Sequence, residues 1–175
     1  MYRLKTPILA ALFLLFAGFA HSTQAQTPRN VVMATAQFKF QGNQVATGLV
    51  PGSADTYYVT YSGQSTNLQN GRSRSSLTIT LHYKANGSVG TVIGGQWAFT
   101  ESVKDRPTFI TGGAISAGAQ LNLKANNTVG QGSLALNFEV GDPTWPVSAV
   151  FTGSLDKSRT PKISGSFTMT YPVIP

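Results

Sequence analysis

Apolar and polar residues alternate with a period of two along much of this chain, and no other feature constrains its fold as strongly. In "ISGSFTMTY", Ile163, Phe167 and Tyr171 alternate with serines and threonines. Because successive residues of a strand point to opposite sides, such a segment predicts a strand with one apolar face and one hydroxyl-bearing face. The same pattern, or a run rich in β-branched and aromatic residues, predicts further strands at "SLTITLHYK", "SLALNFEV", "VVMATAQFKF", "DTYYVTYSG" and "WPVSAVFTGSL".

Turn-forming residues separate these segments, and they set the fold class. The stretches "NGRS", "ANGS", "TGGA", "SAGA", "ANNT" and "VGDP" supply glycine, asparagine and aspartate. Asn86-Gly87 is the hairpin expected between "LTITLHYK" and "VGTVIGGQWAF", and no window has the period of an amphipathic helix. We therefore predict an all-β fold: an antiparallel β-barrel, or a two-sheet β-sandwich, of about eight to ten strands joined by short hairpins. The barrel is favoured because it removes exposed sheet edges in a chain that is only 11% charged.

The first 25 residues have the features of a secretory signal peptide. Arg3 and Lys5 precede a short apolar run, "ILAALFLLFAGFA", and Thr23-Gln24-Ala25 follows it with small residues at the positions that a signal peptidase reads. We expect cleavage after Ala25, a single all-β domain over residues 26–175, and a periplasmic or secreted bacterial protein. The alternative is an uncleaved membrane anchor. We expect no transmembrane helix in the mature chain.

The composition argues against several kinds of chemistry. The chain has no cysteine, which excludes thiolate metal sites, disulfides and cysteine catalysis. The mature part contains one histidine, His82, and no glycine-rich loop with the pattern of a nucleotide site. We therefore predict no metal, no cofactor and no specific nucleic-acid partner. The formal charge of +7 falls to about +5 when Arg3 and Lys5 leave with the signal peptide, a mild bias towards anionic partners.

The stretch "GGQWAFTESVKDRPTFITGG" contains the first group of candidate site residues. Alternation places Trp97 on an inward face, and the preceding Gly94-Gly95 pair predicts a bulge or bend in the strand. Glu101, Asp105 and Arg106 follow in a charged loop. They form either an acid–base cluster at a barrel mouth or an ordinary solvated hairpin.

Aromatic and basic residues supply the remaining candidates. Tyr57 and Tyr61 share one strand face and, with His82, are candidates for lining a pocket. Two basic groups lie in turn-like stretches, and they form an anion-facing rim if their loops share one end of the barrel. These residues are Arg72, Arg74, Lys157, Arg159 and Lys162.

Three functional hypotheses follow. The first is a non-enzymatic exported barrel that binds a small ligand in its interior, or a glycan or protein partner through its surface. The second is an isomerase- or cyclase-type enzyme with a cavity on a small barrel, using Glu101, Asp105, Arg106 or His82. The third is a structural protein or a small outer-membrane barrel. Catalytic residue types are scarce, so we expect a binding protein rather than an enzyme, with the oligomeric state left open.

Overall fold

A computed structural model describes residues 32–69, 74–140, 148–156 and 161–173, and all regular structure within them is β-strand. The described residues contain no helix able to cross a membrane. Chain contacts divide the protein at Asn30, and every described residue belongs to the part that follows it. The predicted signal peptide, residues 1–25, lies outside the described residues. The strands are β1 (Val32–Leu49), β2 (Thr56–Asn67), β3 (Arg74–Asn86), β4 (Val89–Ser102), β5 (Phe109–Ala114), β6 (Gln120–Asn122), β7 (Gly132–Phe138), β8 (Ser148–Leu155) and β9 (Lys162–Val173).

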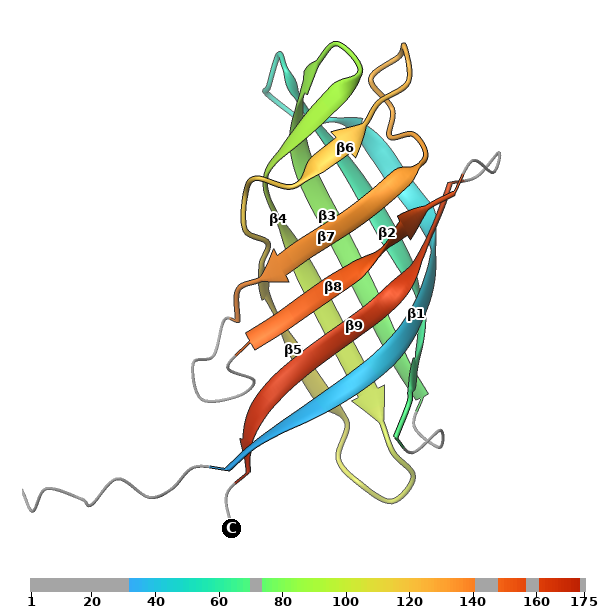
Figure 1. The fold of residues 1–175 in the computed structure, drawn as a ribbon, viewed down its shortest axis with the longest axis vertical. Coiled ribbons are helices and arrows are strands. Elements are labelled where there is room, and N and C mark those ends of the chain that lie inside the picture. The colour runs from blue at the N-terminus through green and yellow to red at the C-terminus, as the bar shows by residue number, and fades with distance from the viewer. Residues whose placement is uncertain (1–31, 70–73, 141–147, 157–160, 174–175) are drawn as a thin grey trace, which may run out of the picture. The chain divides into compact units, whose positions relative to one another are not determined.

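All nine strands belong to one antiparallel sheet that curls round on itself (Figure 1). The order is β5-β4-β3-β2-β1-β9-β8-β7, and β6 pairs with β4. The sheet's edges meet where Ile115 bridges Phe138, and Glu139 N–H donates to the Ala114 carbonyl at 2.8 Å. The prediction of an antiparallel all-β fold with about eight to ten strands is confirmed, in its barrel-like form.

The first and last strands are neighbours in this sheet. β1 pairs with β9 over twelve consecutive positions, from Val32 opposite Val173 to Asn43 opposite Lys162. From β1 to β5, strands that are neighbours in the sheet are also consecutive in the sequence, so each pair forms a hairpin. The sheet therefore combines local hairpins with one long-range pairing between the two chain ends.

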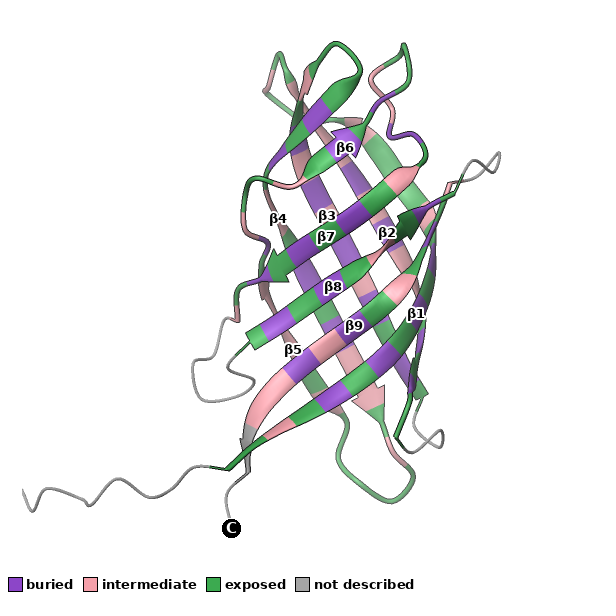
Figure 2. Ribbon diagram, in the orientation of Figure 1, coloured by how far each residue is buried: buried purple, intermediate pink, exposed green. Residues whose placement is uncertain are grey.

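Buried and exposed residues alternate along the strands, as the sequence predicts, and the buried residues are mostly apolar (Figure 2). Phe167 lies at its centre, with ring centroids 5.3 Å from Phe99 and 5.7 Å from Phe138. Phe38 packs edge-on against Phe99 at 4.8 Å, and Trp97 stacks on Phe138 at 5.1 Å. Aromatic side chains thus pack against one another in this part of the interior.

Four inward glycines cross the sheet on a diagonal, and we call them the glycine row: Gly63 on β2, Gly42 on β1, Gly165 on β9 and Gly153 on β8. Gly42 lies opposite Gly63, and Gly153 opposite Gly165. A β-carbon at Gly63 would overlap the carbonyl oxygen of Gln41, so the backbones approach too closely for a side chain. The ends of the Phe40 and Phe151 rings lie over these glycines. Glycine at such positions permits the sharp bending that a curled sheet requires.

Two local predictions are confirmed between β3 and β4. The hairpin forms with Gly87 and Ser88 as its central residues, and Gly87 has a φ of 61°. His82 lies opposite Gly94 while Tyr83 lies opposite Val92, so Ile93 is the extra residue of a bulge. Gly94 and Gly95 have φ values of 150° and 157°, which favour glycine. The bulge thus lies at the expected paired glycines.

Candidate functional site

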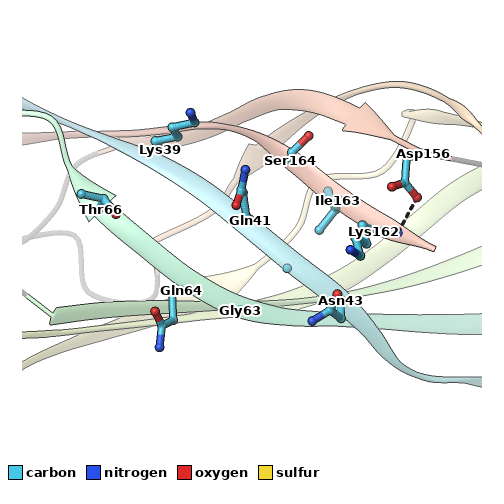
Figure 3. Close-up of a pocket in the computed structure, with 11 residues that line it drawn as sticks. Lys39, Gln41, Asn43, Gly63, Gln64, Thr66, Asp156, Lys162, Ile163 and Ser164 are labelled. Atoms are coloured by element: carbon cyan, nitrogen blue, oxygen red, sulfur yellow. Dashed lines mark hydrogen bonds between the residues drawn. The ribbon is translucent and has the colours of Figure 1, made fainter. Parts of the chain in front are cut away.

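A polar groove lies on the outer face of β9, β1 and β2, with a volume of about 860 Å³ (Figure 3). We call it the outer groove. Its side chains are mostly amides, hydroxyls and amines, since the apolar faces of the same strands point inward. The polar residues that line it are Lys39, Gln41, Asn43, Gln64, Thr66, Asp156, Lys162 and Ser164.

Strand register arranges these side chains in transverse rows. Gln41 on β1 lies opposite Gln64 on β2 and Ser164 on β9. Lys39 lies opposite Thr66 and Ser166, and Asn43 lies opposite Ser62 and Lys162. Neighbouring strands are about 4.8 Å apart, and successive rows on one face are about 6.6 Å apart. The groove therefore offers hydrogen-bonding groups at regular intervals in two directions.

The outer groove lies over part of the glycine row. Gly42 and Gly63 face each other directly beneath the outward Gln41, Asn43 and Gln64, and both glycines line the groove. Because neither carries a side chain, β1 and β2 bend here more closely than other residues would allow. The glycine row thus permits the close approach of the strands that carry the groove.

Cations lie at both ends of the groove. Lys39 and Asn43 are four residues apart on β1, or roughly 13 Å, and Lys162 is the neighbour of Asn43 on β9. The carboxylate of Asp156 accepts a hydrogen bond from the Lys162 backbone N–H at 3.0 Å, so it caps the start of β9. The groove therefore presents two ammonium groups with amides and hydroxyls between them, and the carboxylate of Asp156 at the Lys162 end.

A second polar hollow, of about 450 Å³, continues the groove across β3 and β4. It shares Gln64 and Thr66 with the outer groove and adds the cation Arg74. Register extends the central row from Gln64 to Ser76 and then to Thr100. The two hollows meet at Gln64 and Thr66 and together span five neighbouring strands; we call them the polar track.

The structure places Trp97 in the core. Its side chain is 3% exposed, and its indole Nε1–H donates to the Glu139 carbonyl at 2.9 Å. Stacking on Phe138 completes its surroundings. Trp97 is therefore a packing residue near the seam between β5 and β7, and it lines neither of the two hollows.

Glu101, Asp105, Arg106 and His82 do not come together. Glu101 lies near the end of β4, where the Asn67 side-chain amide donates to its carboxylate at 3.4 Å. Asp105 and Arg106 lie in the exposed β4–β5 loop, in a turn closed by Arg106 N–H and the Val103 carbonyl. His82 is on the outer face of β3, opposite Tyr58. No acid–base cluster forms from these four residues.

Tyr57 closes one end of the interior. Its ring stacks on Tyr83 with centroids 5.8 Å apart, and its hydroxyl accepts a hydrogen bond from the Asn127 side chain at 2.8 Å. The Tyr83 hydroxyl donates to the Asn127 carbonyl, also at 2.8 Å. Asn127 adopts a left-handed φ of 58° in the "ANNT" turn. These three residues contact one another at one end of the interior, and Tyr57 lines neither of the two hollows.

Tyr61 is fully buried and differs from the other tyrosines of the interior. Its hydroxyl has no hydrogen-bond partner among the described residues. Burial raises the pKa of Tyr61 above its ordinary value of 10.0, with smaller contributions from Tyr83 and Asp156. The phenol is therefore neutral at physiological pH.

The predicted cationic rim does not form from the described residues. Arg72, Lys157 and Arg159 lie outside them. Arg74 begins β3 and Lys162 begins β9, and antiparallel order places these strand starts at opposite ends of the barrel (Figure 1). Both residues instead border the polar track.

Sequence reasoning missed Lys39, Gln41, Asn43 and Gln64. The signal was present in "QFKFQGN", where polar residues alternate with two buried phenylalanines. Within the described ranges, no group of three or more histidine, aspartate or glutamate side chains is placed to hold a metal ion. No protein-family model matches this chain, and a search of curated proteins found no significant match.

Proposed function

We propose that this is an exported bacterial binding protein that holds an anionic polysaccharide along the polar track. The single observation that carries the proposal is the outer groove, in which Lys39 and Lys162 flank a row of amides and hydroxyls. Amide and hydroxyl side chains match the hydroxyls of sugars, and ammonium groups match their carboxylates or sulfates. The pattern at the N-terminus and the mild positive charge of the mature chain support the same proposal.

The filled interior favours surface binding over the other hypotheses. Phe38, Phe99, Phe138 and Phe167 pack against one another where a carrier or a cavity enzyme would need space. An outer-membrane barrel would present an apolar band to lipid. The outward side chains of β1 and β2 include Lys39, Gln41 and Gln64. Because these side chains are polar, this face favours contact with water and polar ligands over contact with lipid.

Calorimetry tests the proposal by measuring the binding of residues 26–175 to a linear polyuronate. Neutral dextran serves as the comparison. We expect binding to the polyuronate that weakens with salt. A Lys39→Gln, Lys162→Gln double variant should bind at least about tenfold more weakly, the equivalent of about 1.4 kcal/mol.

The matched control is a Lys104→Gln, Lys124→Gln double variant, which removes the same charge from exposed loops outside the track. We expect it to bind as the unsubstituted protein does. Equal loss in both double variants would reduce the interaction to net charge and contradict a site in the groove. Absence of polyuronate binding would contradict the proposed ligand class.

A further inference from the structure

Two cations of the polar track lie in one transverse row, on either side of a threonine. Lys39 on β1 lies opposite Thr66 on β2 (Figure 3). Ser65 and Ser75 are an opposed pair, so the same register places Arg74, at the start of β3, beside Thr66. We call Lys39, Thr66 and Arg74 the Thr66 row. Lys39 lines the outer groove and Arg74 the second hollow, whereas Thr66 lines both, so each hollow contributes one cation to this row.

All three residues of the Thr66 row are exposed on the outer face of the sheet. Lys39 lies between the buried Phe38 and Phe40, and Thr66 and Arg74 each adjoin a buried serine. Neighbouring strands are about 4.8 Å apart, so the backbones at Lys39 and Arg74 are about 9.6 Å apart, with Thr66 midway. Both cationic side chains are long enough to span half of that distance. Their charged groups can therefore both reach a group bound over the Thr66 hydroxyl.

The surroundings of the Thr66 row leave its positive charge available to a ligand. Neither Lys39 nor Arg74 forms an ion pair with a described residue. The described residues that line the second hollow include no carboxylate, and "LQNGRS", the sequence between β2 and β3, contains no aspartate or glutamate. The other end of the track differs, because the Asp156 carboxylate lines it together with Lys162. An anion is therefore attracted more strongly to the Thr66 row than to the Lys162 end.

We propose that the Thr66 row binds a tetrahedral oxyanion, the sulfate or phosphate group of an esterified glycan. This inference rests on the proposed function, and it names the anionic group that the ligand carries. An ammonium group, a hydroxyl and a guanidinium group offer donors from three neighbouring strands. A sulfate or phosphate ester has three terminal oxygens to accept them, whereas a carboxylate has two. The guanidinium group of Arg74 can also bind two of these oxygens side by side.

Nuclear magnetic resonance titrations of residues 26–175 with inorganic sulfate and inorganic phosphate test the Thr66 row without a glycan. Acetate at the same ionic strength is the comparison, because its only charged group is a carboxylate. We expect saturable shifts of backbone amide signals centred on Lys39, Thr66 and Arg74. Both tetrahedral anions should bind at least about fivefold more tightly than acetate.

Substitutions at Arg74 test whether the row itself makes the site. Arg74→Gln should weaken sulfate binding about fivefold, and Arg74→Lys should restore part of the loss because it keeps the charge but not the planar fork. Lys124→Gln removes the same charge from an exposed residue outside the track, and it should bind sulfate as the unsubstituted protein does. Thermal unfolding of each variant confirms that it folds.

Three results would each overturn the inference: sulfate and phosphate that bind no more tightly than acetate, shifts centred away from the Thr66 row, or equal sulfate binding by Arg74→Gln and Lys124→Gln. Calorimetry with dextran sulfate separates this failure from failure of the proposed function. If the polyuronate binds in the outer groove but inorganic sulfate does not bind at the row, only the inference fails. If inorganic sulfate binds at the row but neither dextran sulfate nor the polyuronate binds, the row is an anion site and the proposed function fails.

Discussion

Replacement of Tyr61 with phenylalanine should stabilise this protein. The Tyr61 side chain is 0% exposed, and its hydroxyl has no hydrogen-bond partner among the described residues. A buried polar group without a partner costs about 1–3 kcal/mol, because it has lost its bonds to water. Loss of the oxygen atom also leaves a small void, which costs a few tenths of a kcal/mol and so offsets part of the gain in stability. We therefore expect a net gain of about 1 kcal/mol.

Denaturant and thermal unfolding of residues 26–175 measure the change. A gain of 1 kcal/mol corresponds to a rise in Tm of about 2–4 °C for a domain of this size. Tyr83→Phe is the matched control, because it removes a hydroxyl that donates to the Asn127 carbonyl at 2.8 Å. That variant should lose about 1 kcal/mol. If Tyr61→Phe loses stability as Tyr83→Phe does, the reasoning is refuted, since its hydroxyl must then contribute a favourable interaction.

The same variant should also change the response to alkaline pH. Burial raises the pKa of Tyr61 in the folded state above its ordinary value of 10.0. The neutral phenol is favoured by folding, so its contribution is fully present below pH 10 and is lost as the pH rises towards the folded-state pKa. The unsubstituted protein should therefore lose stability above about pH 10 more steeply than Tyr61→Phe. Parallel stability curves for the two proteins in this range would contradict the assignment.

Three further substitutions test the bend and the core. Gly63→Ala should cost at least about 3 kcal/mol, because its β-carbon would overlap the Gln41 carbonyl, whereas Gly87→Ala, which meets only open space but has a φ of 61°, should cost about 1–2 kcal/mol. Equal costs in denaturant unfolding would contradict the close approach of β1 and β2. Trp97→Phe should lose about 1–3 kcal/mol, because the Glu139 carbonyl loses its indole donor. Unchanged stability would show that this hydrogen bond contributes little.

The fold was largely predictable because alternation is a local signal. The inward positions of β3 and β9 can be read from "SLTITLHYK" and "ISGSFTMTY" alone, and paired glycines indicated the bulge at Ile93. Such inferences need only the period of a strand and the conformational range of glycine. They do not depend on which strands become neighbours.

The candidate site was not predictable in the same way, since it depends on register. Gln41, Gln64 and Ser164 come from three strands and meet only through the pairings of β1 with β2 and β9. Register also separates residues that the sequence had grouped together. Arg74 and Lys162 both lie in turn-like stretches of the sequence, but they begin strands at opposite ends of the barrel. Glu101 and His82, both candidates for one pocket, lie on opposite faces of the sheet. Glu101 is two residues from the buried Phe99 and so lies on the inner face, whereas His82 is next to the buried Tyr83 and so lies on the outer face.

The pairing of β1 with β9 also determines when the barrel can be completed during synthesis. Hairpins from β1 to β5 can form as soon as their residues leave the ribosome, whereas one edge of β1 must wait for residues 162–173. Until then, β1 exposes unpaired backbone groups beside Phe38 and Phe40. A chain that ends before β9 would keep the open edge permanently, and we expect it to aggregate or to be degraded.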